Sequence, residues 1–119
     1  MASYRDLKVW QLGVDIALEV YRITGDFPKS EQYGLTSQLR RAAVSIASNI
    51  AEGHARKTQK ELHRFLNIAK GSLAELETQL IIARELGFAD GKSMETLFAM
   101  AENESRMLIG LMRSIKDTI

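Results

Sequence analysis

Residues 58–87 read TQKELHRFLNIAKGSLAELETQLIIARELG, and this stretch decides the fold class. Apolar side chains recur along it at steps of three and four, which is the spacing of one face of an α-helix. Thr58 and Glu61 have the spacing of a capping box, and Gly87 is a typical helix end. The stretch therefore predicts one helix of roughly 40 Å, at about 1.5 Å per residue. Its predicted core face consists of Leu62, Phe65, Ala69, Leu73, Leu76, Leu80 and Ala83.

A first helix is predicted ahead of this stretch, opening at Ser3 and running to about Thr24. Ser3 and Asp6 repeat the capping-box spacing, and Gly25 and Pro28 end the periodic pattern. Two apolar stripes run along the surface of this helix, which predicts that two neighbouring elements pack against it. We expect the core stripe to be Leu7, Trp10, Val14, Leu18 and Tyr21, and the second stripe to be Val9, Ile16, Val20 and Ile23.

Two further helices complete the chain. The second has small residues in its core stripe and is expected to end at Gly53, and the fourth follows a break at residues 87–91. Glu104 interrupts the heptad-like seam of the fourth helix. The core positions of the two helices are Leu35, Leu39, Ala42, Ala43, Ile46 and Ile50, and then Met94, Leu97, Ala101, Leu108, Leu111 and Ile115.

The connections between these helices are short. Linkers of about five residues cannot carry the chain back along a bundle, so consecutive helices are expected to run antiparallel. We therefore predict an all-α, antiparallel up-down four-helix bundle, with residues 1–119 as a single domain. The second stripe of the first helix, together with Ile68, Ile82 and Leu86, needs more cover than one bundle provides. We expect the chain to be a subunit of a homo-oligomer.

The amino-acid composition restricts the cellular compartment that we expect for the protein and the kinds of site that it can contain. The chain has no cysteine, which excludes a disulfide framework and a thiolate site. Residues 1–8, MASYRDLK, lack the apolar stretch of a signal peptide, and apolar runs such as residues 80–83 are too short to span a membrane. We expect a cytoplasmic protein that is neither exported nor inserted in a membrane.

No arrangement of residues predicts catalysis or metal binding. His54 and His63 are nine positions apart, which places them on opposite sides of a helix, and His54 is expected in a loop. The serines lack a strand-turn-helix elbow and a glycine-rich phosphate loop. We expect no catalytic residue, metal, cofactor or small-molecule substrate. A metal-dependent enzyme in the bundle core is a further alternative, which elemental analysis would test.

A polar stripe lies beside the apolar stripe of the second helix. In a structural interpretation, its arginines pair with carboxylates and fix the register of the helices. In a functional interpretation, they hold phosphates in fork geometry. The small residues of this helix favour the structural interpretation. The candidate pairs join Arg40 or Arg41 to Glu52, Glu75 or Glu77, and the whole predicted network is Gln38, Arg41, Ser45, Asn49, Glu52, Glu75 and Glu77.

Charge is uneven along the chain, although the formal net charge is only +1. Residues 38–70 carry seven basic and two acidic side chains, whereas the segments on either side are net acidic. A basic cluster at the start of the third helix faces away from its apolar stripe. Such a cluster is either a solvated face or a surface that neutralises phosphates. The candidate nucleic-acid-binding residues are Arg56, Lys57, Lys60 and Arg64, with Arg40 and Arg41 as further contributors.

Several blocks of the chain match a known family in order. They are DLKVWQ (residues 6–11), YGLTSQ (33–38), RRAAVSI (40–46), SNIAEG (48–53) and GSLAELET (71–78). From Tyr4 to about Gly87 the chain resembles the small four-helix-bundle proteins encoded by intervening sequences within bacterial 23S rRNA genes. The resemblance implies a homo-oligomer, a ring of five, without catalytic residues. Members of that family typically carry proline where this chain has Ala47.

Charge segregation and the resemblance together lead to one functional hypothesis. A similar group of accessory proteins in diversity-generating retroelements binds nucleic acid and a reverse transcriptase. We therefore predict a non-enzymatic homo-oligomer, a pentamer, that binds RNA more readily than DNA through a basic surface. The alternative is a protein-interaction scaffold whose basic face meets an acidic partner, such as a reverse transcriptase-like protein.

Overall fold

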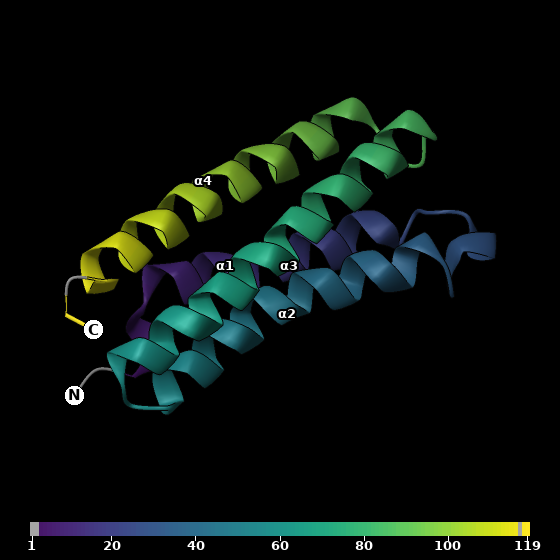
Figure 1. Cartoon of the computed structure of the whole chain (residues 1–119). Coiled ribbons are helices and arrows are strands. Elements are labelled where there is room, and N and C mark those ends of the chain that lie inside the picture. Colours follow the sequence, from purple (N-terminus) through teal and green to yellow (C-terminus); the bar gives the residue numbers. More distant parts are fainter. Residues whose placement is uncertain (1–2, 117) are drawn as a thin grey trace.

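The computed structural model describes residues 3–116 and 118–119 and consists of helices joined by short connections (Figure 1). Its elements are the 3-10 turn η1 (Tyr4–Asp6), α1 (Lys8–Thr24), the 3-10 turn η2 (Lys29–Glu31), α2 (Leu35–Ala55), α3 (Gln59–Glu85) and α4 (Gly91–Lys116). Over the described ranges there is no strand. None of the helices in them is both long enough and apolar enough to cross a membrane.

Consecutive helices run antiparallel and pack side by side (Figure 1). Both α1 and α3 contact α2 and α4, so the four helices form a closed ring of neighbours. This arrangement is the predicted all-α up-down bundle, 46 Å long and 22 by 20 Å across. The start of α1 and the end of α4 lie at the same end of the bundle as the α2–α3 connection (Figure 1). All four helices therefore contribute side chains to that end.

The core of α2, α3 and α4 follows the predicted periodicity. Leu39, Leu76 and Leu97 are fully buried, one from each helix. Leu62 and Leu111, also predicted in the core, are partly buried and pack against its margin. The spacing of apolar residues was therefore sufficient to place the inner faces of these three helices.

The predicted core stripe of α1 is correct only in part. Leu7 and Trp10 are partly buried and pack against the core, but the stripe turns outward along the helix. Leu18 and Tyr21 are 65% and 48% exposed. Periodicity identifies two stripes but does not say which of them other helices will cover. The outer stripe contains aromatic residues with polar tips, which favour a surface, and the ring of Tyr21 lies 4.5 Å beneath the guanidinium carbon of Arg40. The fully buried stripe is instead Val9, Ile16, Val20 and Ile23. One bundle covers these four residues, so the prediction that they need cover from another subunit is wrong, whereas Ile68, Ile82 and Leu86 are exposed.

Two predicted caps are present. The backbone N–H of Ser3 donates to Asp6 Oδ2 at 3.1 Å in a reciprocal capping box, but this box caps η1, and α1 begins only at Lys8. Thr58 caps α3, because its Oγ1 accepts a hydrogen bond from the backbone N–H of Glu61 at 3.1 Å. These short polar residues therefore fix where the first turn and the long third helix begin.

Gly53 does not end α2, contrary to the prediction. The helix continues to Ala55, which places His54 in its last turn rather than in a loop. A Cβ atom on Gly53 would lie only 2.6 Å from the Cβ atom of Phe65 in α3. The glycine therefore permits a close approach of two helices. The chain reverses beyond it, at Lys57, whose φ is 65°.

We expect Gly53→Ala to lower the free energy of unfolding by about 1–3 kcal/mol, because the new methyl group overpacks the contact with Phe65. Gly71→Ala is a matched control, since a Cβ atom at Gly71 meets nothing within 4 Å. That control is expected to stabilise the protein by about 0.5–1 kcal/mol through helix propensity. Urea unfolding measures both changes. Stabilisation by both substitutions would contradict a close approach at Gly53.

Candidate nucleic-acid interface

Phe65, near the start of α3, organises the two arginines of the predicted basic cluster. The guanidinium carbons of Arg56 and Arg64 lie 5.2 Å and 4.5 Å from the centroid of its ring. Arg56 also donates to Glu52 at 2.8 Å, and Arg64 donates to Glu61 at 2.9 Å. The hydrogen bond from Arg64 holds the pKa of Glu61 below its ordinary value. The two arginines are therefore oriented by their neighbours, and their charge is partly compensated.

Lys57 and Lys60 carry the uncompensated charge of this cluster. Lys57 occupies the reversal between α2 and α3, Lys60 lies in the first turn of α3, and both side chains are exposed. Neither lysine forms an ion pair with another described residue. The structure thus brings the four cations predicted from the sequence together around one helix connection.

The fold adds cations to this cluster from both ends of the chain. Ile115 of α4 lines a cavity of about 390 Å³ together with His54 and Lys57, so the last turn of α4 packs beside the α2–α3 connection. Tyr4 of η1 shares another cavity with Ala51 of α2, which brings the start of the chain to the same end. We call this surface the basic end; its cations are Arg5, Lys8, Arg56, Lys57, Lys60, Arg64, Arg113 and Lys116.

The two ends of the bundle have opposite net charge. At the basic end, the described side chains comprise eight cations and three carboxylates, those of Asp6, Glu52 and Glu61. The opposite end, formed by residues 25–34 and 84–95, has three cations and five carboxylates. Reasoning from the sequence missed Arg5 and Arg113 because both lie far along the chain from residues 56–64. The signal that could have found them is the up-down topology, which returns the first and last helix ends to the second connection.

Arg40 and Arg41 do not join the basic end. Arg41 lies fifteen residues before Arg56 on the same helix, which is about 22 Å at 1.5 Å per residue. Arg40 is partly buried, donates from Nε to Thr24 Oγ1 at 2.9 Å and covers the ring of Tyr21. The predicted pairing of Arg40 with a glutamate is therefore wrong, because this arginine faces α1 rather than α3. Arg41 forms no ion pair with a described residue.

A small part of the predicted polar network links α2 to α3. Ser45 Oγ lies 2.9 Å from Ser72 Oγ, and Asn49 Nδ2 donates to the backbone oxygen and Oγ of Ser45 at 2.8 Å and 2.9 Å. Ser72 is buried and was not predicted, although a serine at a core position of a long helix is a signal for such a partner. The network is therefore a hydroxyl and amide cluster without an arginine.

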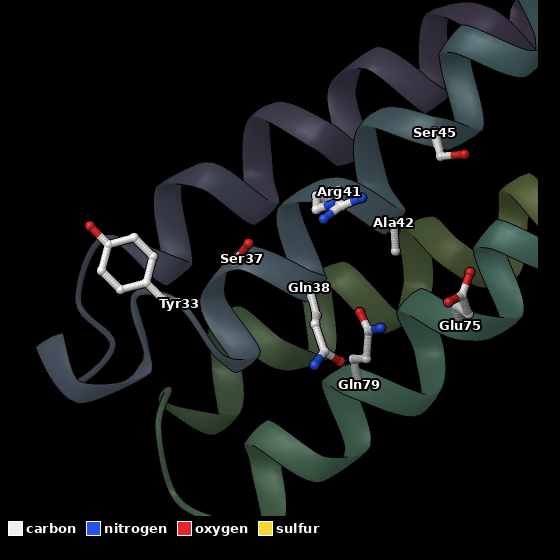
Figure 2. Close-up of a pocket in the computed structure, with 8 residues that line it drawn as sticks. All are labelled: Tyr33, Ser37, Gln38, Arg41, Ala42, Ser45, Glu75 and Gln79. Atoms are coloured by element: carbon white, nitrogen blue, oxygen red, sulfur yellow. The ribbon is translucent and has the colours of Figure 1, made fainter.

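The other predicted network members lie elsewhere. Glu52 pairs with Arg56 at the basic end. Glu77 is partly buried, and burial together with Glu102 of α4 raises its pKa above the ordinary value. The remaining members line a groove between α2 and α3 (Figure 2); they are Gln38, Arg41 and Glu75.

Glu104 is a carboxylate inside the core. Its side chain has no exposed surface, and neither carboxylate oxygen has a hydrogen-bond partner among the described residues. A Cβ atom on Gly13 of α1 would lie 3.1 Å from Glu104 Oε2 and 3.3 Å from the Cβ atom of Ala47 in α2. Two small residues thus make room for the carboxyl group, and burial raises its pKa to about 8. The described residues contain no cluster of His, Asp or Glu side chains placed to hold a metal ion.

The fold and the basic end define a small antiparallel helical bundle with strongly segregated charge. The chain belongs to the 23S rRNA-intervening sequence protein family, whose sequence pattern matches residues 5–110. Its structure is similar to the crystal structure of a protein with unknown function from the S23 ribosomal protein family of Bacteroides thetaiotaomicron. The TM-score is 0.78 at 19% sequence identity, covering 87% of this chain and 97% of that chain, and this likeness shows the fold. No curated protein matches the chain in sequence.

Proposed function

We propose that the protein is a non-enzymatic homo-oligomer that binds nucleic acid, RNA in preference to DNA, through its basic end. The observation that carries the proposal is the convergence of cations from η1, the start of α1, the α2–α3 connection, the start of α3 and the end of α4 on one end, opposite a net acidic end. Such a charge distribution attracts a polyanion to one end and orients its approach. The family is named after intervening sequences of 23S rRNA, so RNA from that locus is the first ligand to test.

The side chains of the basic end suit contacts with phosphates. Lys57 and Lys60 are exposed and unpaired with described residues, so they can bind phosphate oxygens as point charges. Phe65 is only 6% exposed and lies beneath two guanidinium groups, so its ring is closed to base stacking. Contacts of this kind position a nucleic acid without reading its sequence. We therefore expect binding at this end to depend on salt more than on base sequence.

The outer face of α1 and α2 supports self-association. A groove of about 400 Å³ runs between the two helices, lined by apolar side chains that include Trp10, Leu18 and Val44. Leu18 is 65% exposed and Val44 is 42% exposed. Contiguous apolar surface of this kind marks protein interfaces. A ring of five subunits, as the family resemblance implies, would cover this face and repeat the basic end around one axis.

We expect Leu18→Glu to weaken self-association at least about tenfold, because it places a charge in the apolar groove between α1 and α2. Light scattering measures the mass, and the wild-type oligomer is expected near five times the chain mass of 13.3 kDa. Ile109→Glu is the control, since Ile109 is 38% exposed on α4, outside this groove. A wild-type protein of monomer mass, or equal dissociation by both variants, would argue against this interface.

Titration of a fluorescently labelled single-stranded RNA at several salt concentrations tests the proposed function. If about five phosphates are neutralised, binding weakens about 100-fold between about 50 and 200 mM salt. Absent binding, or binding that salt does not change, would refute the proposal. Recovery of an acidic protein partner without nucleic acid would favour the scaffold alternative. Ultraviolet absorbance at two wavelengths, measured on the purified oligomer, detects any nucleic acid that it carries.

A further inference from the structure

A polar groove between α2 and α3 has no role in the function proposed above. We define it by Tyr33, Gln38, Arg41, Glu75 and Gln79. Its volume is about 570 Å³, which is within the range of roughly 300–1,000 Å³ for sites that hold small organic groups. Figure 2 shows Gln38 of α2 facing Gln79 of α3, with Glu75 on the same side of the groove as Gln79. The groove is therefore large enough and polar enough to hold nucleotide groups.

Hydrogen-bonding groups in the polar groove lack partners. Oε1 of Gln79 has no contact with solvent and accepts no hydrogen bond. Arg41 and Glu75 are exposed, and neither forms an ion pair with a described residue. Arg40, unlike Arg41, already has a hydrogen-bond partner, because Thr24 accepts a hydrogen bond from it. Gln79 Oε1 is closed to solvent, so the groups that a ligand in the groove can reach are the exposed side chains of Arg41 and Glu75.

Tyr33 supplies an open aromatic surface at one end of the groove. Its side chain is 91% exposed and extends from the turn between η2 and α2 (Figure 2). A tyrosine so exposed contributes little to the packing of the bundle. Nucleic-acid bases stack on exposed aromatic rings, and basic residues beside the rings track the phosphates. Tyr33 and Arg41 together provide both kinds of contact.

We propose that the polar groove binds bases of the same single-stranded RNA whose backbone lies on the basic end. This inference rests on the proposed function. Arg41 contacts a phosphate, Tyr33 stacks on a base, and Glu75 accepts a hydrogen bond from a base amino group. A carboxylate repels phosphates but accepts from the amino groups of cytosine, adenine and guanine. Uracil has no amino group and offers only its single ring N3–H as a donor, so it is the less favoured base.

The distance between the polar groove and the basic end allows a single RNA strand to contact both. Arg41 and Arg56 are fifteen residues apart on one helix, which corresponds to about 22 Å. Proteins that bind single strands through a basic surface and aromatic platforms cover about 4–16 nucleotides. A strand of about 12 nucleotides therefore has the length to reach from the polar groove to the basic end.

Binding of labelled strands of about 12 nucleotides tests the inference. The strands are oligocytidine, oligouridine and an abasic ribose-phosphate chain of the same length. We expect oligocytidine to bind at least about fivefold more tightly than the abasic chain, with oligouridine between the two, because uracil can stack on Tyr33 but has no amino group. Tyr33→Ala is expected to remove most of the preference for oligocytidine, whereas Tyr33→Phe keeps it. Arg41→Gln is expected to weaken all three strands alike, because it removes a phosphate contact that does not depend on the base. Arg106→Gln, which changes an exposed arginine of α4, is expected to leave the preference unchanged.

The outcomes separate this inference from the function on which it rests. If no strand binds, the proposed function and the inference both fail. If all three strands bind equally and with the expected salt dependence, the proposed function stands and the polar groove has no role in base binding. If Tyr33→Ala weakens oligocytidine and the abasic chain to the same extent, stacking in the groove is likewise refuted.

Discussion

Reversal of three charges at the basic end, through Lys57→Glu, Lys60→Glu and Arg64→Glu together, is expected to weaken RNA binding by about a thousandfold or more. The plot of log affinity against log salt has a negative slope. Each cation that no longer contacts a phosphate makes this slope less steep by about 0.7 on a single strand. The three introduced carboxylates also repel the backbone. Fluorescence anisotropy at several salt concentrations measures both the affinity and the slope.

A second triple variant controls for overall charge. Lys29→Glu, Arg84→Glu and Lys92→Glu change the net charge by the same amount, and all three cations are exposed at the opposite end of the bundle. Screening limits the reach of surface charges to about 10 Å at 0.1 M salt, so this variant is expected to lose little affinity. Equal weakening by the two triple variants would show that binding follows net charge rather than the basic end. Far-ultraviolet circular dichroism verifies that both remain helical.

The helices could be predicted from the sequence because their determinants are local. The hydroxyl of Thr58 caps α3 from the residue next to its start, and core residues such as Leu76 recur with the helical period. Orientation is not local, which is why Leu18 was wrongly predicted in the core of α1. Gly53 shows the same limit, since glycine is common both at helix ends and at close helix contacts. Only the position of Phe65 on another helix distinguishes the two roles.

The candidate site was predictable to the extent that its residues are adjacent in the chain. Lys57 and Lys60 stand three positions apart and could be recognised as a cluster. Arg5 and Arg113 belong to the same surface but are separated by almost the whole chain, so the assembled bundle was needed to place them. The polar groove likewise joins Tyr33 to Gln79, which no periodic pattern connects.

Glu104 is expected to make the stability of the bundle fall as the pH rises from about 4.5 to about 8. Burial raises the pKa of this carboxyl group to about 8 in the folded chain, against an ordinary value of 4.5. Below the lower value both states hold the proton, so folding is not penalised. Between the two values only the unfolded state releases it, which favours unfolding. The gap corresponds to a loss of about 5 kcal/mol by pH 8 and levels off above it.

Substitution of Glu104 separates its contribution to the pH dependence of stability from the contributions of the other titrating groups. Glu104→Leu continues the apolar seam between Ala101 and Leu108, so the variant is expected to be more stable than the wild type at every pH. Its advantage should grow by about 5 kcal/mol between about pH 4.5 and 8.5, as measured by urea unfolding at each pH. Glu104→Gln removes the ionisation but keeps a buried polar group. Its stability advantage over the wild type is expected to grow with pH as that of Glu104→Leu does, but to be smaller at every pH. Parallel stability profiles for the wild type and both variants would mean that Glu104 reaches water or a partner when it ionises.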